Sequence, residues 1–204
     1  VKKQKDTSTE ERILQAAKKV FVAKGMDGAR MQDIANEAGI NKALLHYYFR
    51  SKEQLFETIF QAVSGRLIPQ LNQLLQAELD FYQKIERVCD AYISMAIENP
   101  FMPIFVLSEV NRQPDTFLKK MFGGQLPNLE PFAKQLKLEI KKGNVKKISA
   151  DQLVMHIWSL CVFPFMAKPL FSNLLKIEEK KYRQLMEERK KMVPQFIIES
   201  IKRA

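Results

Sequence analysis

The chain has few of the residues from which enzymes and secreted proteins build their sites. Its 204 residues include only two cysteines and two histidines, and these form no CxxC pair or Cys/His cluster. We therefore expect no zinc site and no disulfide framework, and we expect Cys89 and Cys161 to be buried thiols in a reducing compartment. Because no glycine-rich phosphate loop, GxSxG or HExxH motif is present, the sequence predicts neither an enzyme nor a bound cofactor or metal.

Long apolar runs are also missing. The longest uncharged apolar run extends from Leu153 to Ala167 and contains a histidine and a proline, so it falls short of the roughly 20 apolar residues that cross a bilayer. The N-terminus is charged and lacks the apolar segment of a signal peptide. These absences predict a cytoplasmic protein with no membrane partner.

Glycine is scarce, and strand-like alternation of apolar and polar residues is rare. The chain has seven glycines, whereas Leu, Lys, Gln, Glu, Ala and Met, all good helix formers, are frequent. This composition and the helical spacing of the apolar residues predict an all-α protein of about nine helices. The expected helices span approximately residues 8–25, 31–38, 42–49, 52–75, 80–98, 101–110, 128–142, 150–166 and 177–202.

Positive charge is concentrated near the N-terminus. The net charge is +10, and the first 52 residues carry 11 Lys or Arg against 6 Asp or Glu, compared with 22 against 17 in the rest of the chain. Such a surplus favours an anionic partner, with nucleic acid, acidic lipid and acidic protein as the candidates. The alternative is a solvated basic tail on an ordinary surface.

Residues 31–56 have the pattern of two short helices joined by a tight turn. Gly39 supplies the positive φ that such a turn needs, and Asn41 can cap the second helix. Leu45 is placed to fill the angle between the helices, which frees the opposite face of the second helix to enter the major groove of DNA. A capping box of Ser51 and Gln54 is expected to begin the next helix.

This segment resembles the helix-turn-helix of TetR-family transcriptional regulators over roughly residues 8–60. The residues that agree with the family pattern in register are Ile34, Ala35, Ala38, Gly39, Ile40, Asn41, Lys42, Leu45, His46, Tyr47, Tyr48, Phe49, Ser51, Lys52, Glu53, Leu55 and Phe56. The rest of the chain is similar to the family only in helical character and length. The resemblance implies a helix-turn-helix DNA-binding domain at residues 1–52 and a helical regulatory and dimerisation domain at residues 53–204.

The resemblance also implies which residues contact double-stranded DNA. Some would approach base edges, methyl groups or phosphates from the recognition helix, and others would bind phosphate from its flanks. The expected DNA-binding residues are Arg30, Lys42, Ala43, His46, Tyr47, Tyr48 and Lys52. Two positions depart from the family: Ala29 and Arg30 stand where hydroxyl caps are frequent, so Arg30 is expected to substitute for a hydroxyl–phosphate contact. Leu44 stands where the family often has a hydroxyl.

The helix expected at 150–166 is apolar on more than one face, which a homodimer partner would explain by covering the second face. The alternative is a purely intramolecular core. The family resemblance places the dimer interface on the last two helices. The expected interface residues are Val154, Ile157, Trp158, Cys161, Phe165, Phe196 and Ile197.

Aromatic and methionine side chains also suggest a pocket for an unidentified small-molecule effector of apolar character. The alternative is that they are plain core. The expected pocket residues are Tyr92, Met95, Phe101, Met102, Phe105, Phe122, Trp158 and Phe163. Glu109 and Arg112 are possible polar groups at the same end of the domain.

These observations predict a repressor that binds a palindromic operator as a dimer and is released by a ligand. A DNA-binding architectural or division-site protein of the same fold, without ligand sensing, is the alternative that composition leaves open. A membrane-surface protein is disfavoured because the basic residues belong to the helix-turn-helix and do not form one amphipathic face.

Overall fold

The computed structural model describes residues 7–112, 114–115, 117, 119 and 127–203, and within them the chain forms ten helices. These are α1 (Thr7–Gly28), α2 (Met31–Ala38), α3 (Lys42–Tyr48), α4 (Lys52–Gln76), α5 (Phe81–Glu98), α6 (Met102–Arg112), α8 (Glu130–Lys141), α9 (Ala150–Met166), α10 (Lys168–Leu174) and α11 (Glu179–Ile201). No strand occurs in these ranges, apart from one isolated bridge between Val145 and Lys202. The expected all-α fold is confirmed, and α10 is a helix that the sequence analysis missed.

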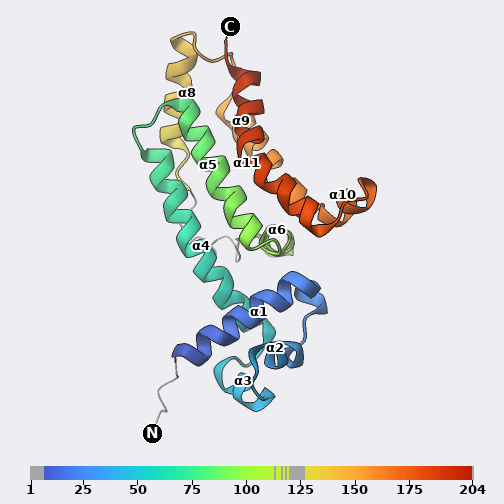
Figure 1. Ribbon diagram of the computed structural model, residues 1–204. Coiled ribbons are helices and arrows are strands. Elements are labelled where there is room, and N and C mark those ends of the chain that lie inside the picture. The colour runs from blue at the N-terminus through green and yellow to red at the C-terminus, as the bar shows by residue number, and fades with distance from the viewer. Residues whose placement is uncertain (1–6, 113, 116, 118, 120–126, 204) are drawn as a thin grey trace.

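The molecule is elongated, with the three N-terminal helices at one end (Figure 1). Helices α1, α2 and α3 gather at the N-terminal end, and α4 leads from them along the length of the molecule. The C-terminus lies at the opposite end, beside α8. The connection between α9 and α11, which contains α10, projects from one side of the helical bundle.

Local side-chain chemistry sets the ends of the N-terminal helices. Gly39 has φ 64° and ψ 36°, the left-handed conformation that ends α2, and Asn41 Oδ1 accepts the Leu44 N–H at 2.7 Å to begin α3. Ser51 caps α4 by accepting the Gln54 N–H at 3.2 Å. The capping box is only half formed, because the Gln54 side chain accepts from the N–H of Arg50 at 2.9 Å.

The first helix does not stop where the sequence suggested. Gly25, the expected end of the helix, has φ 68° and ψ 177° and breaks the helical path, yet α1 resumes and reaches Gly28. The residues after Gly25 therefore form a short extra turn that lies beside the start of α4. This turn becomes part of one of the two cavities described below.

Two hydrophobic clusters make the core. The N-terminal cluster joins α1, α2 and α3 to the first half of α4, and it also includes Phe101, Met102 and Phe117 from later in the chain. The C-terminal cluster is built on α5, α8, α9 and α11. Cys89 and Cys161 are both buried in this second cluster as free thiols, as the sequence analysis expected. Their mutual hydrogen bond and burial raise the pKa of Cys89.

The length and apolar composition of a helix decide whether it could cross a membrane. In the described ranges, no single helix is both long enough and apolar enough to span a bilayer. The pairs α5–α6 and α9–α10 reach that length and composition only together, and they bend by 97° and 70° at their breaks.

Candidate nucleic-acid interface and regulatory cavities

The recognition helix α3 is anchored from one side and exposed on the other. Leu45 is fully buried, and the adjoining Phe49 is 2% exposed, so together they fix the helix against the N-terminal core. The predicted DNA-contacting residues of the opposite face, Lys42, Ala43, His46 and Tyr47, are all exposed. The spacing of apolar and polar residues within a seven-residue helix thus produces one side that packs and one side available to a groove.

Two aromatic residues next to each other on α3 have different environments. Tyr47 is 52% exposed, whereas Tyr48 is only 6% exposed and belongs to the N-terminal core. Their rings meet edge to face at 5.4 Å between centroids, so the buried ring supports the exposed one. The ring of Tyr48 thus packs in the core against Tyr47, and the phosphate contact expected of its hydroxyl stays a prediction.

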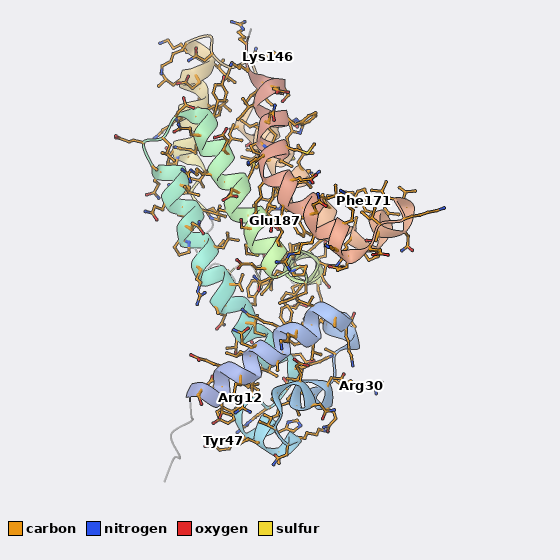
Figure 2. The ribbon with its side chains drawn as sticks, viewed as in Figure 1. Arg12, Arg30, Tyr47, Lys146, Phe171 and Glu187 are labelled. Carbon is orange, nitrogen blue, oxygen red and sulfur yellow. The ribbon has the colours of Figure 1, made fainter. Side chains whose placement is uncertain are left out.

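His46 and Arg30, two more of the expected DNA-binding residues, each make a local contact. The His46 Nδ1 atom is 3.2 Å from the carbonyl oxygen of Arg50, which holds the imidazole at the C-terminal end of α3. The exposed Arg30 precedes α2, and its N–H donates to Asp33 Oδ2 at 3.2 Å. The ammonium of Lys24 hydrogen-bonds to Asp33 and lowers the pKa of that carboxyl. Figure 2 places Arg30 and Tyr47 at the same end of the molecule, away from α10 and α11.

Lys52, expected to bind phosphate, is engaged elsewhere in this structure. Its Nζ donates to the carbonyl oxygens of Met26 at 2.9 Å, Ala29 at 3.3 Å and Asp27 at 3.4 Å. These carbonyls belong to the end of α1 and its connection to α2, where backbone carbonyls have no N–H partner within the helix. The ammonium thus ties the start of α4 to the end of α1. The phosphate contact expected of Lys52 stays a prediction, which would require the ammonium to leave these carbonyls or to bind both.

One cavity of about 670 Å³ lies within the C-terminal part of the chain. It is lined by residues of α4, α5, α6, α8 and α9, and three of the expected pocket residues, Tyr92, Trp158 and Phe163, are among them. The Tyr92 and Trp158 rings lie 5.1 Å apart between centroids. Among the described lining residues none is charged; the polar groups are the Tyr92 and Ser159 hydroxyls and the Trp158 indole N–H. Burial raises the pKa of Tyr92, so its hydroxyl stays neutral.

A second cavity, of about 870 Å³, lies between α1, α4 and α6, and we call it the hinge cavity. Phe101 and Phe105, two more of the expected pocket residues, line this site and not the first one. The two methionines of the expected set, Met95 and Met102, line neither cavity and pack in the core instead. The last member, Phe122, lies outside the described residues. Glu109 and Arg112 also line the hinge cavity, and they pair at 2.6 Å.

The residues of the expected dimer interface fall into two groups by exposure. Ile157, Cys161, Phe165 and Ile197 are between 2% and 8% exposed and lie in the C-terminal core of the single chain. Val154 is only partly buried against the same core. Trp158 and Phe196, by contrast, are 49% and 64% exposed. Helix α9 is apolar all round because one side meets α5 and α11 while another lines the apolar cavity.

Other large apolar side chains of the same two helices are also exposed. Met155 and Phe163 of α9 are each 52% exposed, and Met192 of α11 is 61% exposed. The two helices are held together by hydrogen bonds, such as that from Arg189 Nη2 to the Leu160 carbonyl at 2.6 Å. Helical spacing from Trp158 and Phe196 could have identified these residues, because they flank the same exposed faces.

Comparison with known proteins agrees with this geometry. Residues 13–59 match the model of the family described as bacterial regulatory proteins, tetR family. The chain is 32% identical over 80 residues to the HTH-type transcriptional activator FasR of Mycolicibacterium smegmatis, which covers 39% of this chain and 36% of FasR. It is 29% identical over 97 residues to the nucleoid occlusion factor SlmA of Vibrio vulnificus, covering 47% of this chain and 50% of SlmA. These matches thus span half or less of each relative.

Similarity of the whole fold extends further than similarity of sequence. The solved structure of HlyIIR, a hemolysin II transcriptional regulator, matches with a TM-score of 0.62 and 25% identity, covering 97% of this chain and 98% of that one. The matched family segment contains α2, α3 and the anchoring residues of α3. The N-terminal segment of this chain thus matches the tetR family of bacterial regulatory proteins, and its fold as a whole is similar to that of a solved transcriptional regulator.

Proposed function

We propose that the protein is a repressor that binds a palindromic operator as a homodimer and is released by an uncharged apolar ligand. The observation that carries the DNA-binding part is the division of α3 into a buried anchor and an exposed face. Lys42 and Tyr47 on that face offer a cation and a hydrogen-bonding aromatic to a major groove. A dimer would place two such helices about 34–36 Å apart, one turn of DNA.

The exposed apolar residues of α9 and α11 support the dimer. Met155, Phe163, Met192 and Phe196 are each more than half exposed, and large side chains of this kind gathered on neighbouring helices mark interaction surfaces. A second copy of the chain would cover them by placing its own α9 and α11 against this pair. We therefore propose these four residues, in place of the buried ones, as the centre of the interface.

The cavity in the regulatory part supports an apolar effector. Its described lining carries no charge to balance an ion, and burying an unpaired charge there would be costly. The Tyr92 hydroxyl and the Trp158 N–H provide at most a few polar contacts. A hydrophobic molecule with one or two hydroxyl or carbonyl groups fits this lining better than a carboxylate or an ammonium does.

Helix α6 provides the route from the cavity to the DNA-binding end. Val106 and Val110 line the cavity, while Phe105 of the same helix packs against Phe56 of α4 at 3.9 Å between ring centroids. Phe101, just before α6, meets Phe21 of α1 at 6.0 Å. A ligand that displaced α6 would therefore shift α1 and α4, and with them the spacing of the two recognition helices.

The experiment uses fluorescence anisotropy with the DNA that flanks the gene. Footprinting should show two protected half-sites centred one helical turn apart. Binding of uncharged apolar compounds is followed through the emission of Trp158, the single tryptophan, and operator affinity is then measured at saturation. The proposal predicts lower operator affinity in the liganded protein. Constant affinity with every compound that binds would refute ligand release.

Nucleoid binding is the second candidate, favoured by the similarity to SlmA over 97 residues. An architectural protein of this kind would bind many chromosomal sites, and ligands in the cavity would leave its DNA affinity unchanged. Chromatin immunoprecipitation separates the two: a repressor gives one or a few peaks at promoters, whereas an architectural protein gives many peaks spread over the chromosome.

A further inference from the structure

We infer that the hinge cavity is a second ligand site, one that takes a hydrophobic organic cation. The cavity has a volume of about 870 Å³ and is bounded by the end of α1, the start of α4 and the whole length of α6. It is separate in its lining residues from the apolar cavity near Trp158. The proposed function above does not use it.

The walls of the hinge cavity are unusually rich in phenylalanine. Six phenylalanines line the cavity. Each ring contacts at least one other, with distances between ring centroids of 3.9 to 6.0 Å. They are Phe21, Phe56, Phe60, Phe101, Phe105 and Phe117. Aromatic faces attract cations through the ring quadrupole, and they do so more strongly where water is excluded. A hydrophobic cation bound here would be stabilised both by this attraction and by burial of its apolar surface.

The charged groups at the cavity rim point to the same ligand class. Four cations line the cavity, and each already has an oxygen partner in the described structure. Lys24 pairs with Asp33, Lys52 with three carbonyls, Arg112 with Glu109 and Lys168 with Glu179.

The carboxylates at the rim are not all paired in this way. Asp27 and Glu53 line the cavity, and neither has an ion-pair partner among the residues that the structure describes. Lys52 hydrogen-bonds only to uncharged carbonyls, and Glu57 also lines the cavity. Counted together with Asp33 and Glu179, the carboxylates that pair with two of its lysines, the site has four cations and six carboxylates around its aromatic side chains, which is an excess of negative charge. This combination favours a cation over an anion of the same shape and size.

A ligand in this cavity would contact both the DNA-binding end of the protein and α6. Gly25 and Glu53 belong to the DNA-binding end, whereas Phe105 and Ser108 belong to α6. Binding there would depend on how α6 sits against α1 and α4, so the ligand and the operator would affect each other's affinity reciprocally. Only this coupling rests on the proposed function; the binding itself does not.

The test compares two ions of nearly the same shape and opposite charge, without DNA. Tetraphenylphosphonium and tetraphenylborate are titrated calorimetrically into the full chain, while Trp158 emission reports occupancy of the other cavity. We expect the phosphonium to bind at one site per chain without quenching Trp158, and tetraphenylborate not to bind at that site. Quenching of Trp158 by the phosphonium, equal affinity for both ions, or no binding at millimolar concentration would overturn the inference.

Charge variants locate the site. Asp27→Asn with Glu53→Gln should weaken phosphonium binding about fivefold, because two exposed carboxylates contribute up to about 1 kcal/mol together. The matched control, Glu86→Gln with Asp90→Asn, removes the same charges from the exposed side of α5 and should leave binding unchanged. Ser108→Lys, which adds a cation to the cavity wall, should weaken phosphonium binding and permit the borate to bind. Equal affinities in all three variants would refute the site.

An operator titration then tests the coupling alone. If the phosphonium binds as expected but operator affinity stays constant, the site stands and its regulatory role fails. If the protein binds no operator, the proposed function fails and the ligand site is still decided by calorimetry.

Discussion

Lys52 offers a sharp test, because the structure gives it a role that DNA binding alone would not suggest. Its ammonium donates to three carbonyls at 2.9, 3.3 and 3.4 Å, of which the last is the weakest. Hydrogen bonds from a charged donor contribute about 1.5–3 kcal/mol each at best. Since Lys52 is only half-buried, we expect Lys52→Met to lower the free energy of unfolding by about 1–2 kcal/mol.

The same substitution should hardly affect the salt dependence of DNA binding. Each phosphate contact contributes about 0.9 to the slope of log K against log salt, so a residue used by both subunits contributes about 1.8. Lys42 is exposed at the start of α3 and is the matched control. Lys42→Met should lower the slope by about 1.8 and change stability by less than about 0.5 kcal/mol.

The assays are urea denaturation and anisotropy titration at four or five salt concentrations. Lys52→Met should lower the free energy of unfolding and leave the salt dependence of DNA binding almost unchanged, whereas Lys42→Met should do the reverse. It is refuted if Lys52→Met reduces the slope by about 1.8 and leaves the denaturation midpoint where it was. Lys52 would then release the α1 carbonyls to bind phosphate in the complex.

Three further predictions concern recognition, assembly and pH. Tyr47→Ala should reduce discrimination between operator variants by about 1–3 kcal/mol at the base pairs it reads, measured by competition with mutated operators; a uniform loss across all sequences would contradict a base-reading role. Phe196→Asp should convert dimer to monomer in sedimentation, because a carboxylate replaces an apolar side chain at the proposed interface; an unchanged dimer would exclude that placement. Burial lowers the pKa of Lys84 in the folded protein, so the unfolded chain binds more protons at alkaline pH, and stability should rise as the pH increases from the folded pKa towards 10.5. Lys84→Met should abolish this rise in urea denaturation, and a wild-type profile flat over that window would contradict it.

The parts of the fold that depend on local chemistry were predictable from sequence. Gly39, Asn41 and Ser51 each act within a few residues of their own position, and the structure confirms the turn and the two caps. The helical spacing of apolar residues set the ranges of most helices within a few residues. The exposed face of α3 followed from the same spacing, since Leu45 had to be the buried anchor.

The parts that depend on long-range packing were not predictable. An apolar residue on α9 has the same sequence pattern whether it packs against α11, a cavity or a partner chain. Ile157 and Cys161, which were expected at a dimer interface, are buried within the single chain. The expected pocket residues divided between two cavities for the same reason. The role of Lys52 was hidden because its carbonyl partners lie more than 20 residues away in the chain.

The N-terminal core includes Phe101 and Met102, which come about 50 residues after α4 begins. The part of the protein that binds DNA is thus completed by residues that a boundary at residue 52 assigns to the sensor. A chimera that grafts residues 1–60 onto another sensor would leave Phe21 and Phe56 against a foreign surface. Exchange between regulators of this architecture is therefore expected to succeed only when α6 and its preceding turn travel with the DNA-binding helices, or when the recipient's own α6 supplies matching aromatics.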